Sequence, residues 1–124
     1  LAAYQTTRSD PLWSTYRGLR MATNQPPGGG IMLVQMLNIL EGYDLAASGS
    51  GSAATTHLIV EAMRRAYADR AQHLGDPAFN QTMPIDRLTS KAHAADLRGT
   101  INLERASIPD AQKVLDTLSR VIGI

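Results

Sequence analysis

The clearest pattern in the sequence is an almost unbroken apolar run at residues 31–40, in which only two amide side chains are polar. A helix on a protein surface keeps one polar face, so a run this apolar predicts a helix that is buried on several sides. We expect the helix to extend from about Gly30 to Glu41, with Gly42 as the residue that follows its C-terminus.

A second helix is predicted over residues 53–74, where apolar side chains recur at helical spacing. Ser52 is a suitable N-cap, and the sequence Gly-Asp-Pro at 75–77 ends the pattern. The adjacent Arg64 and Arg65 are interpreted as part of the solvated face. The expected buried positions are Thr55, Leu58, Ile59, Ala62, Met63, Ala66 and Tyr67.

The last helix is predicted over residues 109–122, with a start at 107–110 that resembles a capping box and an end at Gly123. We expect its apolar stripe to pack on the rest of the chain. The stripe consists of Ala111, Val114, Leu115, Leu118, Val121 and Ile122. A weaker helical stretch covers 84–97 and can restart at Thr89 or Ser90.

The front of the chain has a different pattern. Residues 1–25 contain two short runs of β-prone residues on either side of Gly18, which predicts a hairpin or an edge strand pair. The Pro-Gly sequence at 26–30 is interpreted as a hinge, and 31–122 as helical apart from a flexible connection at 45–51. The predicted fold is an α-rich α+β segment in which about four helices follow a short N-terminal β element.

Composition narrows the function classes. The chain has 124 residues, 44% hydrophobic and 19% charged, as is typical of one globular domain. A net charge of +1 argues against a nucleic-acid partner, and the absence of cysteine excludes thiolate chemistry. No run reaches the roughly 20 apolar residues of a membrane span, and no signal peptide is visible. Because the chain begins at Leu1 instead of Met, we expect it to be a segment of a longer protein.

An ordered set of four phrases resembles the latter part of the large subunit of γ-glutamyltransferases (γ-glutamyltranspeptidases). The match covers roughly residues 1–105. The phrases are Tyr16-Arg17-Gly18; Asn24-Gln25-Pro26-Pro27-Gly28-Gly29-Gly30; Gln35 to Leu45 (Gln-Met-Leu-Asn-Ile-Leu-Glu-Gly-Tyr-Asp-Leu); and Glu61-Ala62 with Ala66-Tyr67-Ala68-Asp69-Arg70 and Leu74-Gly75-Asp76-Pro77.

The resemblance implies a segment of an N-terminal nucleophile hydrolase, in which two sheets lie between helical layers. In that family the precursor cuts itself, and the new N-terminal Thr of the small subunit transfers a γ-glutamyl group from glutathione or a related amide to water or an amino acid. A hydroxyl beside its own α-amine has a built-in base for such chemistry. The implied partners are the remaining large-subunit and small-subunit portions of the enzyme. A periplasmic or extracellular location would be typical of the family.

The family's nucleophile and substrate-binding positions do not map onto this sequence. We therefore predict no catalytic, substrate-binding, cofactor-binding or metal-binding residue, and no cofactor. The sequence Thr55-Thr56-His57 has the same letters as the family's processing site, but it opens a predicted helix, and we expect Thr55 to face inward. The expected role in the enzyme is that of a scaffold.

Other candidate chemistry has a simpler structural interpretation. Asp69 and His73 lie four residues apart, which suits an acid–base pair but also a surface pair near a helix C-terminus. The glycines at 28–30 precede a helix, but they lack the spacing of a phosphate-binding loop and are interpreted as a packing hinge. His57 and His93 have no partner at zinc-ligand spacing. Residues 80–82 match a glycosylation sequon.

One alternative remains open from the sequence. The chain could fold alone as a small helical domain that binds partners and has no enzymatic activity. The two hypotheses differ in the last helix: a self-contained domain would pack Val114, Leu115, Leu118 and Val121 onto residues 31–40, whereas a segment of a larger enzyme would leave them exposed.

Overall fold

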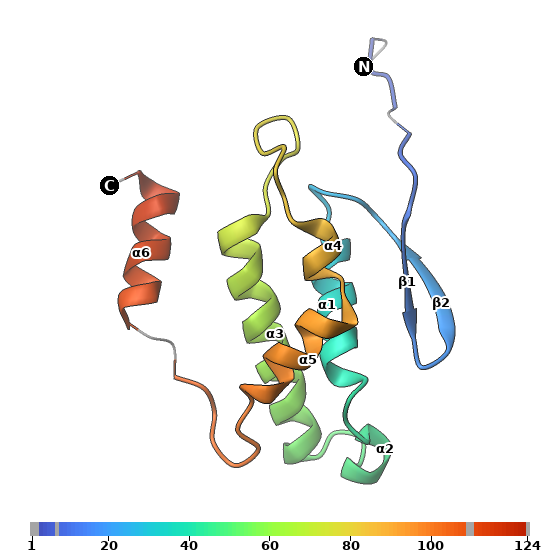
Figure 1. Cartoon of the computed structure of the whole chain (residues 1–124), viewed down its shortest axis with the longest axis vertical. Coiled ribbons are helices and arrows are strands. Elements are labelled where there is room, and N and C mark those ends of the chain that lie inside the picture. The colour runs from blue at the N-terminus through green and yellow to red at the C-terminus, as the bar shows by residue number, and fades with distance from the viewer. Residues whose placement is uncertain (1–2, 7, 109–110, 124) are drawn as a thin grey trace.

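The computed structural model describes residues 3–6, 8–108 and 111–123. These residues form one two-stranded sheet and six helices, an α-rich α+β arrangement (Figure 1). The elements in chain order are β1 Leu12–Tyr16, β2 Leu19–Thr23, α1 Gly30–Leu40, α2 Leu45–Ser48, α3 Ala53–His73, α4 Ile85–Leu88, α5 Lys91–Gly99 and α6 Ala111–Ile122.

The predicted strand pair at the front is confirmed. β1 and β2 are antiparallel, with Leu12 opposite Thr23 and Tyr16 opposite Leu19. The two turn residues have positive φ, +48° at Arg17 and +80° at Gly18, as a tight hairpin turn requires. Glycine adopts this conformation at no steric cost, which explains its place at the tip.

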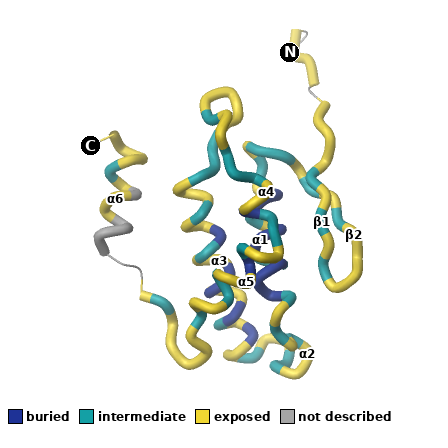
Figure 2. Tube along the Cα trace, viewed as in Figure 1, coloured by how far each residue is buried: buried dark blue, intermediate teal, exposed yellow. Residues whose placement is uncertain are grey.

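Helix α1 packs against both α3 and α5 in the helical part of the chain (Figures 1 and 2). Its Ile31, Val34 and Ile39 are fully buried, which confirms the predicted buried helix. Leu33 is the exception, with 44% of its surface exposed. A cluster of Ile39 with residues from α3 and α5 forms the apolar core, with Tyr43, Leu45, Leu97 and Ile101 packed around it. The other members of that cluster are Leu40, Leu58, Ala62 and Ala94.

The predicted bounds of α3 are confirmed, but the predicted buried face is only partly right. Thr55, Leu58, Ala62 and Ala66 are buried as expected. Ile59, Met63 and Tyr67 are instead 39–50% exposed and leave an apolar surface on the outer side of α3. The buried stripe is rotated toward the side that carries Glu61, because Glu61 has polar partners inside the molecule.

One of the two four-residue helices was not predicted. The expected flexible connection at 45–51 contains α2, whose first turn is capped by the Asp44 carboxylate accepting a hydrogen bond from the Ala47 amide at 3.0 Å. The weak helical stretch at 84–97 divides into α4 and α5. Ser90 caps α5 by accepting from the His93 amide at 3.1 Å, so the predicted restart is confirmed.

Two glycines are required by close packing and not by backbone conformation. Gly42 does not have the left-handed φ expected of a residue that ends a helix; a Cβ there would lie 2.0 Å from the guanidinium carbon of Arg98. At Gly30 a Cβ would lie 2.2 Å from the backbone oxygen of Asn24. The backbone therefore approaches closely at Gly30, and the interpretation of residues 26–30 as a packing hinge stays a prediction.

Helix α6 lies apart from the core at the end of a long connection (Figure 1). Its predicted helical character is confirmed over Ala111–Ile122, and Gly123 has a φ of +72° at its end. The predicted cap includes residues 109–110, which lie outside the described residues. The expectation that the stripe packs on the chain is wrong for Leu115, Leu118 and Val121, which are 49–73% exposed.

No helix among the described residues combines the length and the apolar character that crossing a membrane requires.

Candidate functional site

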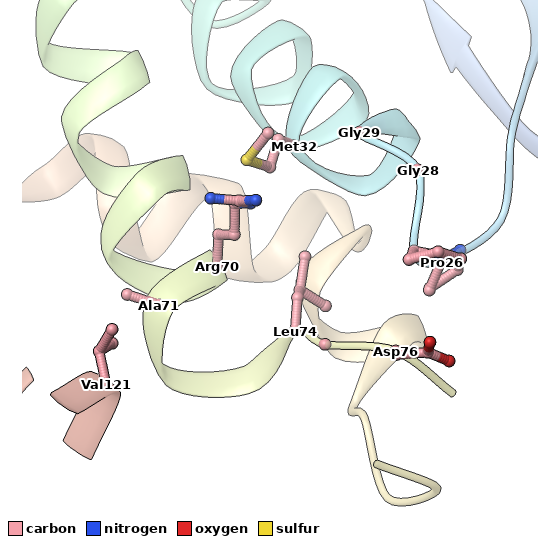
Figure 3. Close-up of a pocket in the computed structure, with 11 residues that line it drawn as sticks. Pro26, Gly28, Gly29, Met32, Arg70, Ala71, Leu74, Asp76 and Val121 are labelled. Carbon is pink, nitrogen blue, oxygen red and sulfur yellow. The ribbon is translucent and has the colours of Figure 1, made fainter. Parts of the chain in front are cut away.

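An open pocket of about 400 Å³ lies beside the hinge. It lies between the start of α1 and the end of α3, and Val121 of α6 contributes to one side (Figure 3). The lining residues are Pro26, Pro27, Gly28, Gly29, Met32, Arg70, Ala71, Leu74, Gly75, Asp76 and Val121.

The charges in this pocket do not favour one kind of ligand. Arg70 extends toward Met32, while Asp76 lies on the opposite side, near Pro26 (Figure 3). An anion would meet both the arginine and a carboxylate of the same sign as itself. The pocket therefore has no predominant charge that would identify a substrate, and its walls are mainly backbone and apolar side chains.

A cluster of polar side chains lies inside the helical part, where α1, α3 and α5 meet. The Asp69 carboxylate accepts hydrogen bonds from the side chains of Gln35 and His93, with His93 Nε2 at 2.6 Å. The side chains of Asp69 and His93 are only 13% and 12% exposed. These bonds join three helices, so they stabilise the arrangement of α1 and α5 on α3.

This arrangement corrects the proposed pairing of Asp69 with His73. Although the two residues share a helix, His73 Nε2 lies 3.0 Å from a guanidinium nitrogen of Arg87 instead. Asp69 is held by the residues that pack on the inner face of α3. The acid–base pair suggested by the spacing in α3 is therefore not formed.

Another cluster of polar side chains is centred on Glu61, whose side chain is completely buried. One carboxylate oxygen accepts from the Ser107 amide at 3.0 Å, and the other accepts from Arg65 at 2.7 Å and from the Ser107 hydroxyl. Burial raises the pKa of Glu61, but the hydrogen bonds from Ser107 and Arg65 outweigh burial and lower that pKa to about 2. Glu61 is thus a stable buried carboxylate, unsuited to exchanging protons near neutral pH.

Arg65 was interpreted as part of a solvated face, and this interpretation is wrong. Its side chain is 11% exposed, and its guanidinium also donates to the backbone oxygens of Leu97 at 3.1 Å and Thr100 at 2.7 Å. Arg64, with 43% of its side chain exposed, fits the interpretation better. A signal was present in the sequence: Glu61 and Arg65 are four residues apart, the spacing at which opposite charges pair on a helix.

The sequence Thr55-Thr56-His57 lies in the first turn of α3, as predicted. Thr55 faces inward, and its hydroxyl donates to the backbone oxygen of Gly49 at 2.7 Å. His57 Nε2 lies 2.7 Å from the backbone oxygen of Asn102. These contacts give Thr55 a structural role at a helix start, inside a continuous chain and away from any free α-amine.

Metal ligands are not gathered in the described part of the chain, where no three His, Asp, Glu or Cys side chains meet. Polar side chains of the interior hold helices together instead. Asn38 donates to the backbone oxygen of Thr89 at 2.8 Å, and Arg98 donates to the backbone oxygens of Asn38 and Ile39.

Comparison with known proteins identifies the family. The family model described as Gamma-glutamyltranspeptidase matches residues 1–119. The chain is 43% identical to the Acylase ACY 1 proenzyme of Pseudomonas sp. (strain SE83), covering 86% of this chain and 19% of that protein. It is 42% identical to the Glutathione hydrolase proenzyme of Escherichia coli (strain K12), covering 86% of this chain and 18% of that protein.

Comparison with solved structures supports the same family. The gamma-glutamyltranspeptidase of Helicobacter pylori matches with a TM-score of 0.78 and 37% identity, covering 86% of this chain and 30% of that one. The Pseudomonas nitroreducens enzyme, solved as a complex with L-DON, matches with a TM-score of 0.73 and 34% identity, covering 86% and 32%. The chain spans about a fifth of the length of the curated relatives it matches. From its sequence and its fold, the chain belongs to the γ-glutamyltranspeptidase family of transferases and hydrolases that are made as proenzymes.

Proposed function

We propose that this chain is part of the large subunit of a γ-glutamyltransferase or glutathione hydrolase, and that its role there is to support the catalytic part. The complete enzyme would transfer a γ-glutamyl group from glutathione or a related amide to water or an amino acid. Residues 1–124 would form one segment, with residues 31–122 in a helical layer of a fold that has two sheets between helical layers.

The observation that carries this proposal is the family match over residues 1–119, combined with a share of only 19% of the full-length relative. Most of such an enzyme, including its nucleophile, would be supplied by other parts of the polypeptide. The partners of this segment would be those remaining large-subunit and small-subunit portions.

The exposed apolar side chains support the same proposal. Ile59, Met63 and Tyr67 on α3 and Leu118 on α6 are 39–50% exposed. Large apolar side chains that are exposed along the face of a helix are typical of an interface with another part of a protein. A self-contained binding domain would instead have packed the stripe of α6 onto α1, so the stand-alone alternative receives less support.

The relatives leave a second candidate substrate class. An acylase proenzyme at 43% identity and a glutathione hydrolase proenzyme at 42% identity are equally similar to this chain. The complete enzyme could therefore act on a different acyl amide. The described residues that line the hinge pocket carry one arginine and one carboxylate, and they do not favour either class.

Turnover of a chromogenic γ-glutamyl anilide tests the proposal. The 124-residue chain alone is expected to release no more anilide product than buffer does. Its Thr55 is buried in the first turn of α3, in the middle of the chain, so the Thr55 hydroxyl has no adjacent α-amine to act as a base. A longer polypeptide that continues into the nucleophile-bearing part is expected to turn the anilide over.

The Thr55→Ala variant of the longer polypeptide is the matched control. Within Thr55-Thr56-His57, it removes the threonine hydroxyl that faces inward. It should keep its turnover number once folded. Sustained turnover by the isolated chain would contradict the proposed scaffold role, and an acyl amide hydrolysed faster than the γ-glutamyl anilide by the longer polypeptide would select the acylase alternative.

A further inference from the structure

Ser107 is bonded to α3 through every polar group it has. Its amide donates to Glu61 Oε1 at 3.0 Å, and its hydroxyl donates to Glu61 Oε2. Its backbone oxygen accepts from the side chain of Arg64. Ser107, in the connection between α5 and α6, is thus bonded to α3 through its backbone amide, its backbone oxygen and its side-chain hydroxyl.

The residues that hold Ser107 are themselves fixed. Glu61 is fully buried, and its carboxylate is joined to Arg65 at 2.7 Å. Arg65 reaches further, donating to Thr100 Oγ1 at 2.8 Å and to the Thr100 backbone oxygen at 2.7 Å. The carboxylate and guanidinium therefore join α3, the end of α5 and the connection to α6. Hydrogen bonds to charged groups are the stronger ones in proteins, and those to the Glu61 carboxylate are shielded from water because Glu61 is fully buried.

The part of the connection before Ser107 is held differently. The Asn102 side chain accepts from the amides of Glu104 and Arg105, which makes a local turn, and the Asn102 backbone oxygen contacts His57. Among the described residues between this turn and α6, which are 106–108, Ser107 is the one that bonds to the buried Glu61. The exposed stripe of α6 adds little packing, since Leu115 and Val121 are 56% and 73% exposed.

We propose that Glu61, Arg65 and Ser107 form a clamp that fixes the point at which the chain leaves the helical core toward α6. The clamp is a conformational device and does not depend on the proposed enzymatic function. Its role is local: it should set the mobility of residues 101–108 and the position of α6, while the packing of α1 against α3 and α5 is stabilised by other contacts.

Peptide-resolved hydrogen exchange on the full 124-residue chain tests the clamp. In Ser107→Ala one charge-assisted hydrogen bond is lost, so exchange of the amides at 101–108 is expected to rise about tenfold. Exchange at 31–40, which reports unfolding of the whole core, should remain slower than exchange at 101–108. Cleavage by trypsin after Arg105 should rise in parallel, because Arg105 lies in the released segment. The matched control is Ser50→Ala, an exposed serine in the turn before α3.

A second variant removes the charge. Glu61→Gln keeps the shape of the side chain but loses the ion pair with Arg65, so the amides at 101–108 should exchange at least as fast as in Ser107→Ala. The clamp is overturned if Ser107→Ala exchanges within twofold of Ser50→Ala at 101–108. It is also overturned if the amides at 101–108 exchange as slowly as those at 31–40 in the unaltered chain, because the connection would then open only together with the core.

Discussion

Helices α1 and α6 both present apolar side chains, and they lie in opposite environments (Figure 2). In α1, Ile31 and Ile39 are fully buried, and the helix packs against α3 and α5. In α6, Leu118 and Val121 are 49% and 73% exposed, although the apolar and polar positions of α6 are separated on two clear faces.

Polar contacts select the neighbours on which α1 packs. Helix α1 is joined to its neighbours through Asn38, Gln35 and two of its backbone oxygens, which accept from Arg98. Each bond has one geometry and one partner, so it selects the neighbour on which the helix packs. Apolar surface alone shows that a helix needs a partner, but it does not select which one.

The largest expected effect contrasts one apolar residue from each helix. Ile39→Ala removes a fully buried side chain, so the free energy of unfolding should fall by about 2–5 kcal/mol. Leu118→Ala removes a half-exposed side chain and should change the free energy by about 0.5 kcal/mol or less. Urea unfolding of the two variants measures both. Equal losses would show that α6 is packed as closely as α1.

Acid should weaken the core through Glu61. The pKa of Glu61 in the folded chain is about 2, against an ordinary value of 4.5, so its contribution is fully present above pH 4.5 and is lost as the pH falls toward 2. This pKa difference corresponds to roughly 3 kcal/mol.

Urea unfolding between pH 6 and pH 2.5 measures that loss. Glu61→Gln cannot titrate at this position, so its stability should fall less steeply over the same range. If the two proteins lose stability in parallel, the buried carboxylate is not the group responsible.

A smaller effect is expected where α1 begins. Gly30→Ala places a Cβ 2.2 Å from the backbone oxygen of Asn24, so the chain must shift, at a cost of about 1–3 kcal/mol. Gly99→Ala is the matched control, because a Cβ there meets nothing within 4 Å. Thermal unfolding should separate the pair clearly. A Gly30→Ala variant as stable as Gly99→Ala would mean that the hinge is open and not closely packed.

The smallest effect concerns the exposed side of the contact between α1 and the hairpin. Lys91 donates to Glu41 Oε2 at 2.5 Å, which lowers the pKa of Glu41, together with a bond from the Arg17 amide. Because 47% of the Lys91 side chain is exposed, Lys91→Ala should cost only about 0.2–1 kcal/mol. The loss should shrink further in 1 M salt, and a salt-independent loss would show that packing and not charge is responsible.

The sequence predicted the elements that depend on local chemistry. The hairpin around Gly18, the buried helix at 31–40 and the caps at Ser52 and Ser90 need only a turn residue, an apolar run or a hydroxyl at the right position. The family could be predicted from the phrases that run from residue 16 to residue 77.

The rest depended on contacts between distant residues. Glu61 and Ser107 are separated by 46 positions, so no local pattern shows that a glutamate inside a helix is buried. Once it is buried, the inner face of α3 shifts, and Ile59, Met63 and Tyr67 move outward. The pairing of Asp69 with His93, 24 residues away, could not be separated from a pairing with His73 by spacing alone.

The central claim is that the remainder of a γ-glutamyltranspeptidase-like enzyme covers the outer side of α3. Hydroxyl-radical footprinting tests it directly by comparing the labelling of Met63 and Tyr67 in the isolated chain with their labelling in the longer polypeptide. These side chains are 39% and 50% exposed here, so both should be labelled in the chain alone. We predict that their labelling falls strongly in the longer polypeptide. Equal labelling in both would contradict the claim.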